Sequence, residues 1–353
     1  MKKVLFFIII AICCAGCDNS TTKVSATGSI YECLAVINAE NYNATAAIIK
    51  DVMEDDMIAM PQIESDFTLS HVPAANFDDF LKPTRNILIV DINPNKYTVV
   101  KAKYSRDYWS HPQAVWRVQA PDDAAFAAYW KDNGSKVKAW FVNEELNRQA
   151  MFYRASTNKA ARAALNKRMG CDMLIPEDFV LIKGERLKVR GERDDSIDIV
   201  WCCNNKGPMR RDVVIYSYPY TDAETFTLSY LNAKRDSVLG KLVSATLPGT
   251  YMGTEYKVIP PVMRNLSIND VPQIAVDSTL NGEFWGTEVR GLWKMQGGEA
   301  MGGPYVSLTR INPINGRIVT AETFVFAPGQ KKRNALRQAE AILYTLSFNH
   351  KAQ

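Results

Sequence analysis

Adjacent acidic residues are the side chains of this sequence that could carry out acid–base chemistry. They include Asp78–Asp79, Asp122–Asp123, Glu144–Glu145 and Asp194–Asp195. Catalysis of this kind needs two carboxyl groups that face one substrate, but neighbouring residues of a helix or a strand point apart. Catalytic carboxyl pairs would therefore have to meet through the fold. The alternative that we favour is solvated surface charge, or charge at the start of helices.

Motifs of well-known catalytic machinery are missing from the sequence. It contains no Gly-x-Ser-x-Gly elbow, no His-Glu-x-x-His, and no phosphate loop of the Gly-x-x-x-x-Gly-Lys or Gly-x-Gly-x-x-Gly type. Its three histidines, His71, His111 and His350, are scattered, and no Cys-x-x-Cys lies beyond Cys17. We therefore expect neither a metal site nor a cofactor. The sequence favours a protein without enzymatic activity but does not decide between the two.

Cys17 is the residue whose position most directly predicts a chemical modification. Met1–Lys3 is basic, Val4–Cys14 is almost wholly apolar, and the small pair Ala15–Gly16 precedes Cys17. This pattern is typical of a secretory signal, whose apolar region is too short to span a membrane as a mature helix. The cysteine after two small residues resembles a bacterial lipobox. We expect cleavage after residue 16, a diacylglycerol on the Cys17 sulfur and acylation of its new amino group, for example with palmitate.

Two or more lipid chains anchor a protein stably, so the membrane is an expected partner through Cys17. The alternative is an ordinary secreted protein that is cut near Ala15. Removal of Lys2 and Lys3 changes the balance from 42 basic against 38 acidic residues to 40 against 38. Such a nearly neutral chain gives no reason to expect a nucleic acid partner.

The remaining cysteines are Cys33, Cys171, Cys202 and Cys203. Cys202 and Cys203 are neighbours in a predicted strand, so their side chains point to opposite faces. One of them could bond to Cys33 or Cys171 in an oxidising compartment. We favour the alternative, in which all four are buried, reduced thiols.

Hydrophobic periodicity predicts a mixture of helices and strands. Residues 86–92 read as a buried strand, and residues 305–311 and 317–326 as strands joined by a turn at Asn315–Gly316. A helix should begin near Pro121 and pause at Asn133–Gly134. The closing helix has one apolar face, formed by Ala335, Leu336, Ala339, Ile342, Leu343 and Leu346.

Short recurring sequence motifs suggest an internal duplication. Met53-x-x-Asp56-Met57 recurs as Met169-x-x-Asp172-Met173, and Arg85–Val90 has a counterpart in Arg211–Tyr216. We expect an α+β fold with largely antiparallel sheets, helices packed on one face and two similar halves. The boundaries are a cleaved signal at 1–16, a flexible tether at 17–28, a first half at 29–155 and a second at 156–350. The two halves could pack as one domain.

Two clusters are candidates for a ligand surface. Tyr216, Tyr218 and Tyr220 alternate, so they share one side of a strand and could form an aromatic platform for a sugar or a peptide. The alternative that we favour is a sheet face covered by the following helix. Arg290 and Trp293, with the nearby glycines Gly302 and Gly303, could form a loop through which backbone approaches a ligand. The alternative is a plain connection between strands.

Several of these segments together resemble a family of uncharacterised Bacteroidota lipoproteins that is defined only as a domain of unknown function. The segments are Arg85–Asp91, Ile215–Asp222, Ala233–Val238, Arg290–Trp293, Met301–Pro304 and Lys332–Ala341. The resemblance covers nearly all of the chain from Ser29. It implies a lipid-anchored envelope protein and supplies no catalytic residues. The segment after Cys17 lacks the lysine-plus-acidic-pair pattern that resembles a surface-export tag, so we expect the periplasm-facing side of the outer membrane.

Two functions follow from these observations. The first is non-catalytic binding or scaffolding of an envelope partner, which would be a protein, a glycan or a lipid. The second is a hydrolase or transferase that acts on envelope glycans or peptides, with carboxylates that converge only in the fold. An enzyme should hold a pair of acidic groups, or a nucleophile with a base, in a pocket. A binding module should instead expose apolar or aromatic side chains at its site.

Overall fold

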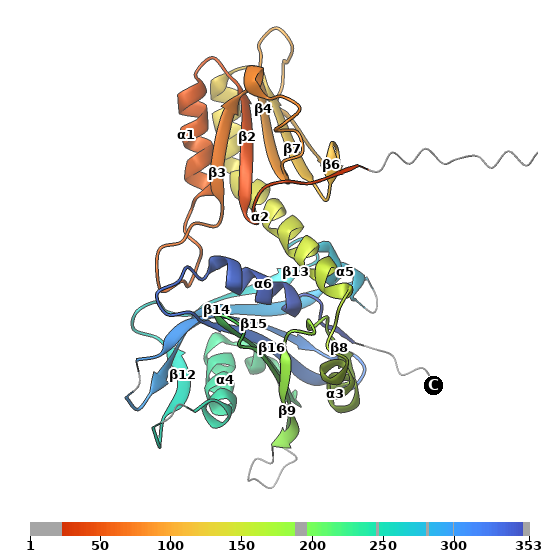
Figure 1. Ribbon diagram of the computed structural model, residues 1–353, viewed down its shortest axis with the longest axis vertical. Helices are drawn as coiled ribbons and strands as arrows, with labels where there is room; N and C mark the ends of the chain where they lie inside the picture. Colours follow the sequence, from red (N-terminus) through yellow and green to blue (C-terminus); the bar gives the residue numbers. More distant parts are fainter. Residues whose placement is uncertain (1–22, 188–195, 245–246, 280–281, 299, 349–353) are drawn as a thin grey trace, which may run out of the picture.

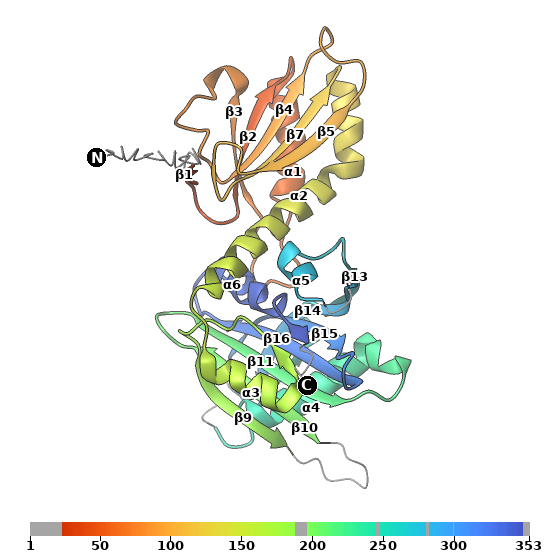
Figure 2. The ribbon, with the colours of Figure 1, turned by 90° about the vertical axis from the view of Figure 1, so that its right-hand side faces the viewer.

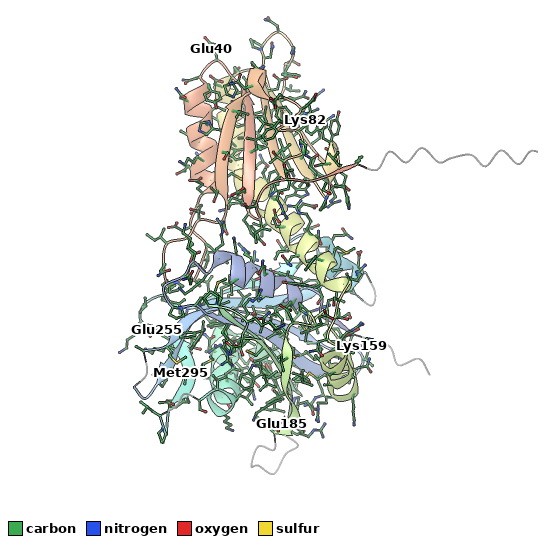
Figure 3. The ribbon with its side chains drawn as sticks, viewed as in Figure 1. Glu40, Lys82, Lys159, Glu185, Glu255 and Met295 are labelled. Atoms are coloured by element: carbon green, nitrogen blue, oxygen red, sulfur yellow. The ribbon has the colours of Figure 1, made fainter. Side chains whose placement is uncertain are left out.

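The computed structural model describes residues 23–187, 196–244, 247–279, 282–298 and 300–348. Cys17 and Asp194–Asp195 lie outside these residues. The described chain forms two layered units that are stacked along the long axis of the molecule and joined by one long helix (Figure 1). Glu40 lies near one end of this axis and Glu185 near the other (Figure 3). None of the described helices combines the length and the apolar character that a membrane crossing requires.

The first unit is a sheet with helices on one face. Its elements are β1 (Val24–Ser25), β2 (Glu32–Asn38), α1 (Tyr42–Met53), β3 (Thr68–Pro73), the 3-10 helix η1 (Ala74–Asn76), β4 (Asn86–Ile92), β5 (Lys101–Arg106), β6 (Ser110–His111), β7 (Ala114–Ala120) and α2 (Asp123–Arg154). The strand order is β3-β2-β4-β7-β5, and only β5 runs antiparallel to its neighbour. α1 and α2 cover one face, where Ile49, Phe67 and Phe141 belong to the core.

The second unit is built on an eight-stranded antiparallel sheet. Its elements are α3 (Lys159–Met169), β8 (Cys171–Asp172), β9 (Val180–Leu187), β10 (Ile197–Asn204), β11 (Arg210–Pro219), the 3-10 helix η2 (Ala223–Phe226), α4 (Leu228–Leu242), β12 (Tyr251–Glu255), β13 (Val262–Ser267), α5 (Gln273–Asp277), β14 (Trp285–Gln296), β15 (Gly302–Ile311), β16 (Arg317–Phe326), α6 (Arg333–Leu343) and β17 (Ser347–Phe348). The order is β12-β14-β15-β16-β11-β10-β9, and β13 also pairs with β14.

Both faces of the large sheet are covered. α3 and α6 contribute Leu165 and Leu336 to the core on one face. α4 contributes Leu239 to the core on the other face, and Figure 1 shows α6 and α4 on opposite sides of the strands. All eight residues of β10 are buried for this reason. Our expectation of helices on one face therefore holds for the first unit and is corrected for the second.

The α+β class is confirmed, but the two units do not repeat one topology. The first sheet is mostly parallel, whereas every pairing in the second is antiparallel. Parallel neighbours need a crossover such as α1, which joins β2 to β3, while antiparallel neighbours need only a turn. The hairpin of β15 and β16 is such a case, and Gly316 has the positive φ of +67° that its turn needs. The expectation of two similar halves is thus corrected.

Helix α2 connects the units without the pause that we expected at Asn133–Gly134. Asp122 caps its start by accepting a hydrogen bond from the Ala125 N–H at 2.8 Å. The helix continues through Gly134, against which the Trp130 ring packs so closely that a Cβ would lie 3.0 Å from it. Figure 2 shows α2 running from the first sheet down to α5 and α6.

Polar contacts across the junction hold the start of α6. Glu64, from the first unit, accepts hydrogen bonds from the backbone N–H groups of Lys332 at 2.7 Å and Arg333 at 2.9 Å. The N-cap residue of α6, Lys332, offers no side-chain cap of its own. The first N–H groups of a helix lack partners within the helix, and its N-terminus favours negative charge. A carboxylate of one unit therefore caps a helix of the other.

A network of alternating positive and negative side chains continues from this cap into the second unit. Arg337 of α6 donates to Asp66 of the first unit at 2.7 Å and to Glu340 at 3.0 Å. Arg290 contacts Glu340 as well and donates to Glu288 at 2.8 Å. These side chains are largely buried, so each charge is stabilised by the oppositely charged side chains beside it in this network.

Candidate functional site

The predicted tyrosine platform is mostly covered. Tyr216 and Tyr218 are buried on the face of β11 that packs under α4, with ring centroids 6.1 Å apart. Lys234 of α4 lies over the Tyr218 ring, 4.8 Å from its centroid. Tyr220 follows the strand and remains exposed beside Phe226. The structure therefore buries Tyr216 and Tyr218 on a sheet face that is covered by the following helix.

Arg290 and Trp293 lie on opposite faces of β14, so the structure does not bring them together. Arg290 belongs to the network of charged side chains under α6, whereas Trp293 packs in the core under α4. The indole N–H of Trp293 donates to the Val325 carbonyl at 3.3 Å. Trp293 also lines an apolar pocket of about 320 Å³, together with Met252, Met295, Met301, Phe324 and Phe326.

Gly302 and Gly303 are needed for the close packing of backbone, not for a ligand loop. A Cβ on Gly302 would lie 2.7 Å from the Trp293 carbonyl oxygen. A Cβ on Gly303 would lie 2.0 Å from the Val325 carbonyl oxygen. Both glycines are part of β15, where the chain is regular strand.

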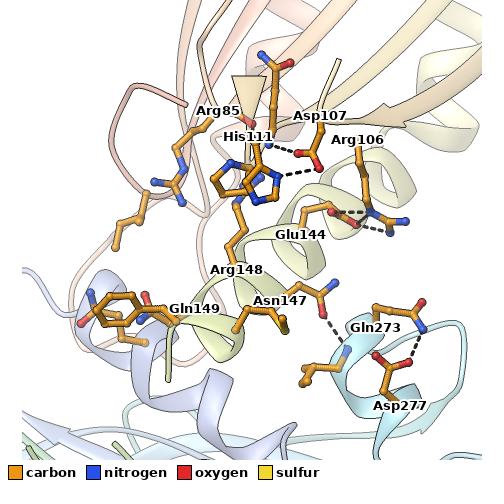
Figure 4. A pocket seen from close by; sticks show the side chains of 17 residues that line it. Arg85, Arg106, Asp107, His111, Glu144, Asn147, Arg148, Gln149, Gln273 and Asp277 are labelled. Atoms are coloured by element: carbon orange, nitrogen blue, oxygen red, sulfur yellow. Dashed lines mark hydrogen bonds and ion pairs between the residues drawn. The ribbon is translucent and has the colours of Figure 1, made fainter. Parts of the chain in front are cut away.

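A cleft of about 790 Å³ lies between the two units. Figure 4 shows its lining. The lining residues come from the first unit, from α2, from α5 and from α6: Ile30, Arg85, Arg106, Asp107, His111, Pro112, Gln113, Glu144, Asn147, Arg148, Gln149, Met151, Phe152, Gln273, Ile274, Asp277 and Gln338. None of the predicted ligand-surface residues is among them. We call this space the interunit cleft.

The first-unit end of the cleft is built around Glu145 of α2, whose carboxylate is about 1% exposed. Glu145 accepts hydrogen bonds from Arg85 at 2.9 and 2.7 Å and from the Asn86 amide at 2.7 Å. Arg148, one helical turn later, is 2.8 Å from the same carboxylate. Two guanidinium groups thus share one carboxylate. Burial lowers the pKa of Arg148, although Glu145 opposes this effect.

Glu144, the neighbour of Glu145, points to another partner. Its carboxylate accepts hydrogen bonds from Arg106 of β5 at distances from 2.6 to 3.0 Å. The hydrogen bonds to Glu144 raise the pKa of Arg106. The side chains of Glu144 and Glu145 diverge, as expected for neighbours on a helix. Both are buried and ion-paired, however, so the interpretation of this pair as solvated charge is corrected.

An aspartate and a histidine lie close together at the rim of the cleft. His111 Nδ1 is 2.9 Å from the Asp107 carboxylate, which also accepts the Gln113 backbone N–H at 2.8 Å. Burial opposes ionisation of Asp107, but the hydrogen bonds from Gln113 and His111 outweigh this effect and hold its pKa below its usual range. A histidine held by a carboxylate can accept a proton from water.

The described lining of the cleft combines charged and amide side chains with exposed apolar ones. It contains no Ser, Thr, Cys, Lys or Tyr side chain that could act as a nucleophile. Its apolar side chains are accessible, with Phe152 74% and Met151 51% exposed at the end of α2. Among the described residues, no three His, Cys, Asp or Glu side chains are grouped as metal ligands would be.

The matches to known families follow the two structural units. Residues 157–345, which are most of the second unit, match a family described as a domain of unknown function, DUF4837. The chain belongs to this DUF4837 family. Residues 26–154, which form the first unit up to the end of α2, match a second domain of unknown function, DUF8532. A comparison with curated proteins finds no match. The interunit cleft therefore lies where the DUF4837 region meets the DUF8532 region.

Proposed function

We propose that this chain is a lipid-anchored cell-envelope protein that binds an envelope partner in the interunit cleft without transforming it. The anchor is the lipidated Cys17, and the body faces the periplasm from the outer membrane. The sequence around Cys17 supports the anchor, and the cleft supports the binding role. The cleft is the single observation that carries the proposal, because pockets with an apolar lining and a few convergent polar groups are the usual form of a ligand site.

The ion pairing of Glu144 and Glu145 favours binding over acid–base catalysis by these two carboxylates. Glu144 is engaged by Arg106, and Glu145 lies behind Arg85 and Arg148. Each of the two carboxylates is thus already held in an ion pair with arginine. The amide groups of Asn147, Gln149, Gln273 and Gln338 add hydrogen-bond donors and acceptors to the lining.

The Asp107–His111 pair favours one second candidate, a hydrolase that acts on envelope glycans or peptides. In that case His111 would accept a proton from an attacking water molecule, and Asp107 would orient the imidazole. His111→Ala would then abolish turnover of a peptidoglycan digest incubated with the protein, while partner binding would persist. Absence of turnover in the unaltered protein would remove this candidate.

Site-specific photocrosslinking in intact cells tests the binding role. A photoreactive phenylalanine analogue replaces Phe152 at the cleft or, as a matched control, Val99, which is also exposed but does not line the cleft. We expect a defined adduct from position 152, none from position 99, and loss of the adduct in a Cys17→Ala form that is not anchored. Equal labelling from both positions would contradict the proposal.

A further inference from the structure

We infer that the first-unit end of the interunit cleft is an anion subsite, in which Arg85 and Arg148 receive an oxyanion group of the ligand, a carboxylate or a phosphate. The inference rests on the proposed function and specifies what its ligand must carry. Figure 4 shows both arginines on the first-unit side of the cleft, away from Gln273 and Asp277.

The balance of charges at this end of the cleft is the first argument. Arg85 and Arg148 together carry two positive charges, and the Glu145 carboxylate that they share supplies one negative charge. Arg106 adds no excess, because it is paired with Glu144 alone. One guanidinium charge at this end of the cleft therefore lacks a full counterion.

The other carboxylates of the lining do not supply that counterion. Asp107 is occupied by His111 and by the Gln113 backbone N–H. Asp277 lies on α5, where its carboxylate accepts a hydrogen bond from the Gln273 amide at 2.9 Å. Neither carboxylate contacts Arg85 or Arg148: Arg85 is directed to Glu145, and Arg148 is directed to Glu145 and Asn86.

The relative exposure of the three charged groups is the second argument. The Arg85 and Arg148 side chains are 20% and 10% exposed, whereas Glu145 is 1% exposed. The carboxylate thus lies behind the guanidinium groups, and an anion that enters the cleft meets the guanidinium groups first. Paired guanidinium groups bind carboxylates and phosphates through charge-assisted hydrogen bonds.

The hydrogen bonding of Arg148 is the third argument. Its Nη2 donates to Asn86 Oδ1 at 2.5 Å, but its Nη1 makes only a long contact of 3.5 Å with the Arg85 carbonyl oxygen. Its buried Nε has no acceptor among the described residues. A buried guanidinium group with incomplete hydrogen bonding is costly, so a ligand anion nearby would be stabilising.

The rest of the cleft indicates what is attached to the anion. Ile30, Ile274 and the exposed side chains of Met151 and Phe152 line the same space. The ligand class that fits is an organic acid or phosphate ester with a partly apolar body. Free inorganic anions would use only the arginine end.

Thermal unfolding of the lipid-anchored protein in zwitterionic nanodiscs, followed by tryptophan fluorescence, tests the inference. The probes are acetate, hexanoate and inorganic phosphate, each compared with chloride at equal ionic strength because salt alone screens charge. We expect a saturable rise of the unfolding midpoint. A response to acetate assigns a carboxylate and a response to phosphate assigns a phosphate, while tighter binding of hexanoate than of acetate shows that the apolar lining takes part.

Three matched variants separate the subsite from general charge. Arg85→Gln and Arg148→Gln each leave one arginine to pair with Glu145, so the fold should persist while the apparent affinity falls at least tenfold. Arg106→Gln removes a positive charge from the same cleft but not from the subsite, and it should bind as the unaltered protein does. Arg85→Gln is the decisive variant if Arg148, which is more buried, proves necessary for folding.

The result that overturns the inference is the absence of any saturable response, or an equal loss in Arg85→Gln and Arg106→Gln. This outcome is distinguishable from failure of the proposed function. If the adduct from position 152 forms equally in the Arg85→Gln background, binding in the cleft stands and the anion subsite falls. If anions bind but no adduct forms, the anion subsite is supported and the proposed binding of an envelope partner is refuted.

Discussion

Single residues in this protein show how burial decides chemical behaviour. Cys33, Cys171, Cys202 and Cys203 are all buried and free. Burial raises the pKa of the Cys171 and Cys202 thiols to about 12 and that of Cys203 to about 11. The thiolate is the reactive form of cysteine, so these four residues are inert in the folded state. The reading of them as buried, reduced thiols agrees with the structure.

We predict that the native protein resists alkylation at these cysteines. Incubation with iodoacetamide at pH 8 should leave all four thiols unmodified, because they are both inaccessible and protonated. The same treatment in guanidinium chloride should modify all four, which intact-mass and peptide mass spectrometry would show. Rapid labelling of Cys203, which has the smallest rise in pKa, would contradict its burial.

The elements depend on local sequence features and on close contacts between distant strands. The turn at Asn315–Gly316 and the cap at Asp122 follow from residues that adjoin the element. The glycines of β15 are different, because neighbouring strands leave no space for a side chain at these positions. Gly303 meets the Val325 carbonyl oxygen of β16 and the Trp293 indole of β14. A strand position of this kind tolerates no side chain.

We predict that Gly303→Ala strongly destabilises the second unit. The added Cβ would fall 2.0 Å from the Val325 carbonyl oxygen, so β15 and β16 would have to separate. We expect a loss of about 3 kcal/mol or more in the free energy of unfolding, measured by denaturant titration. Gly184→Ala in β9 is the matched control, because its Cβ would meet Ala164 at an ordinary 3.5 Å. A similar stability for the two variants would show that β15 can move to accept the methyl group.

At the scale of the whole molecule, the interface between the units is held by buried charge. Asp66 receives Arg337 at 2.7 Å and lies 3.1 Å from Lys138. Burial opposes ionisation of Asp66, but these two cations outweigh it and hold its pKa below its ordinary value. Such a group stabilises the folded protein above the pKa that it has in the unfolded chain. The stabilisation is lost as the pH falls through the lower pKa of the folded state.

We predict that acid weakens the junction through Asp66. The free energy of unfolding should change little on this account between pH 8 and pH 5 and should fall below about pH 4, where the unfolded chain binds a proton that the folded chain does not. Asp66→Asn should lower stability at pH 7 by about 1–3 kcal/mol and reduce the fall in acid. Denaturant titrations at several pH values measure both effects. An unchanged acid response in Asp66→Asn would assign it to other groups.

The sequence by itself was sufficient for features that depend on neighbouring residues. The hairpin around Gly316, the buried thiols and the α+β class all follow from local composition and periodicity. Cys17 lies outside the described residues, so its lipidation stays a prediction. Tyr216 and Tyr218 were correctly placed on one face, since side chains alternate along a strand.

Only the tertiary structure decided the candidate site and the direction of the first sheet. Arg85 and Glu145 are separated by 60 residues in the chain, and no local pattern could indicate that they pair. The cleft lining extends from Ile30 to Gln338, so its residues meet only when α2 brings the two units together. Burial and ion pairing depend on such distant contacts. For that reason Glu144–Glu145 read as solvated charge in the sequence and is buried and paired in the fold.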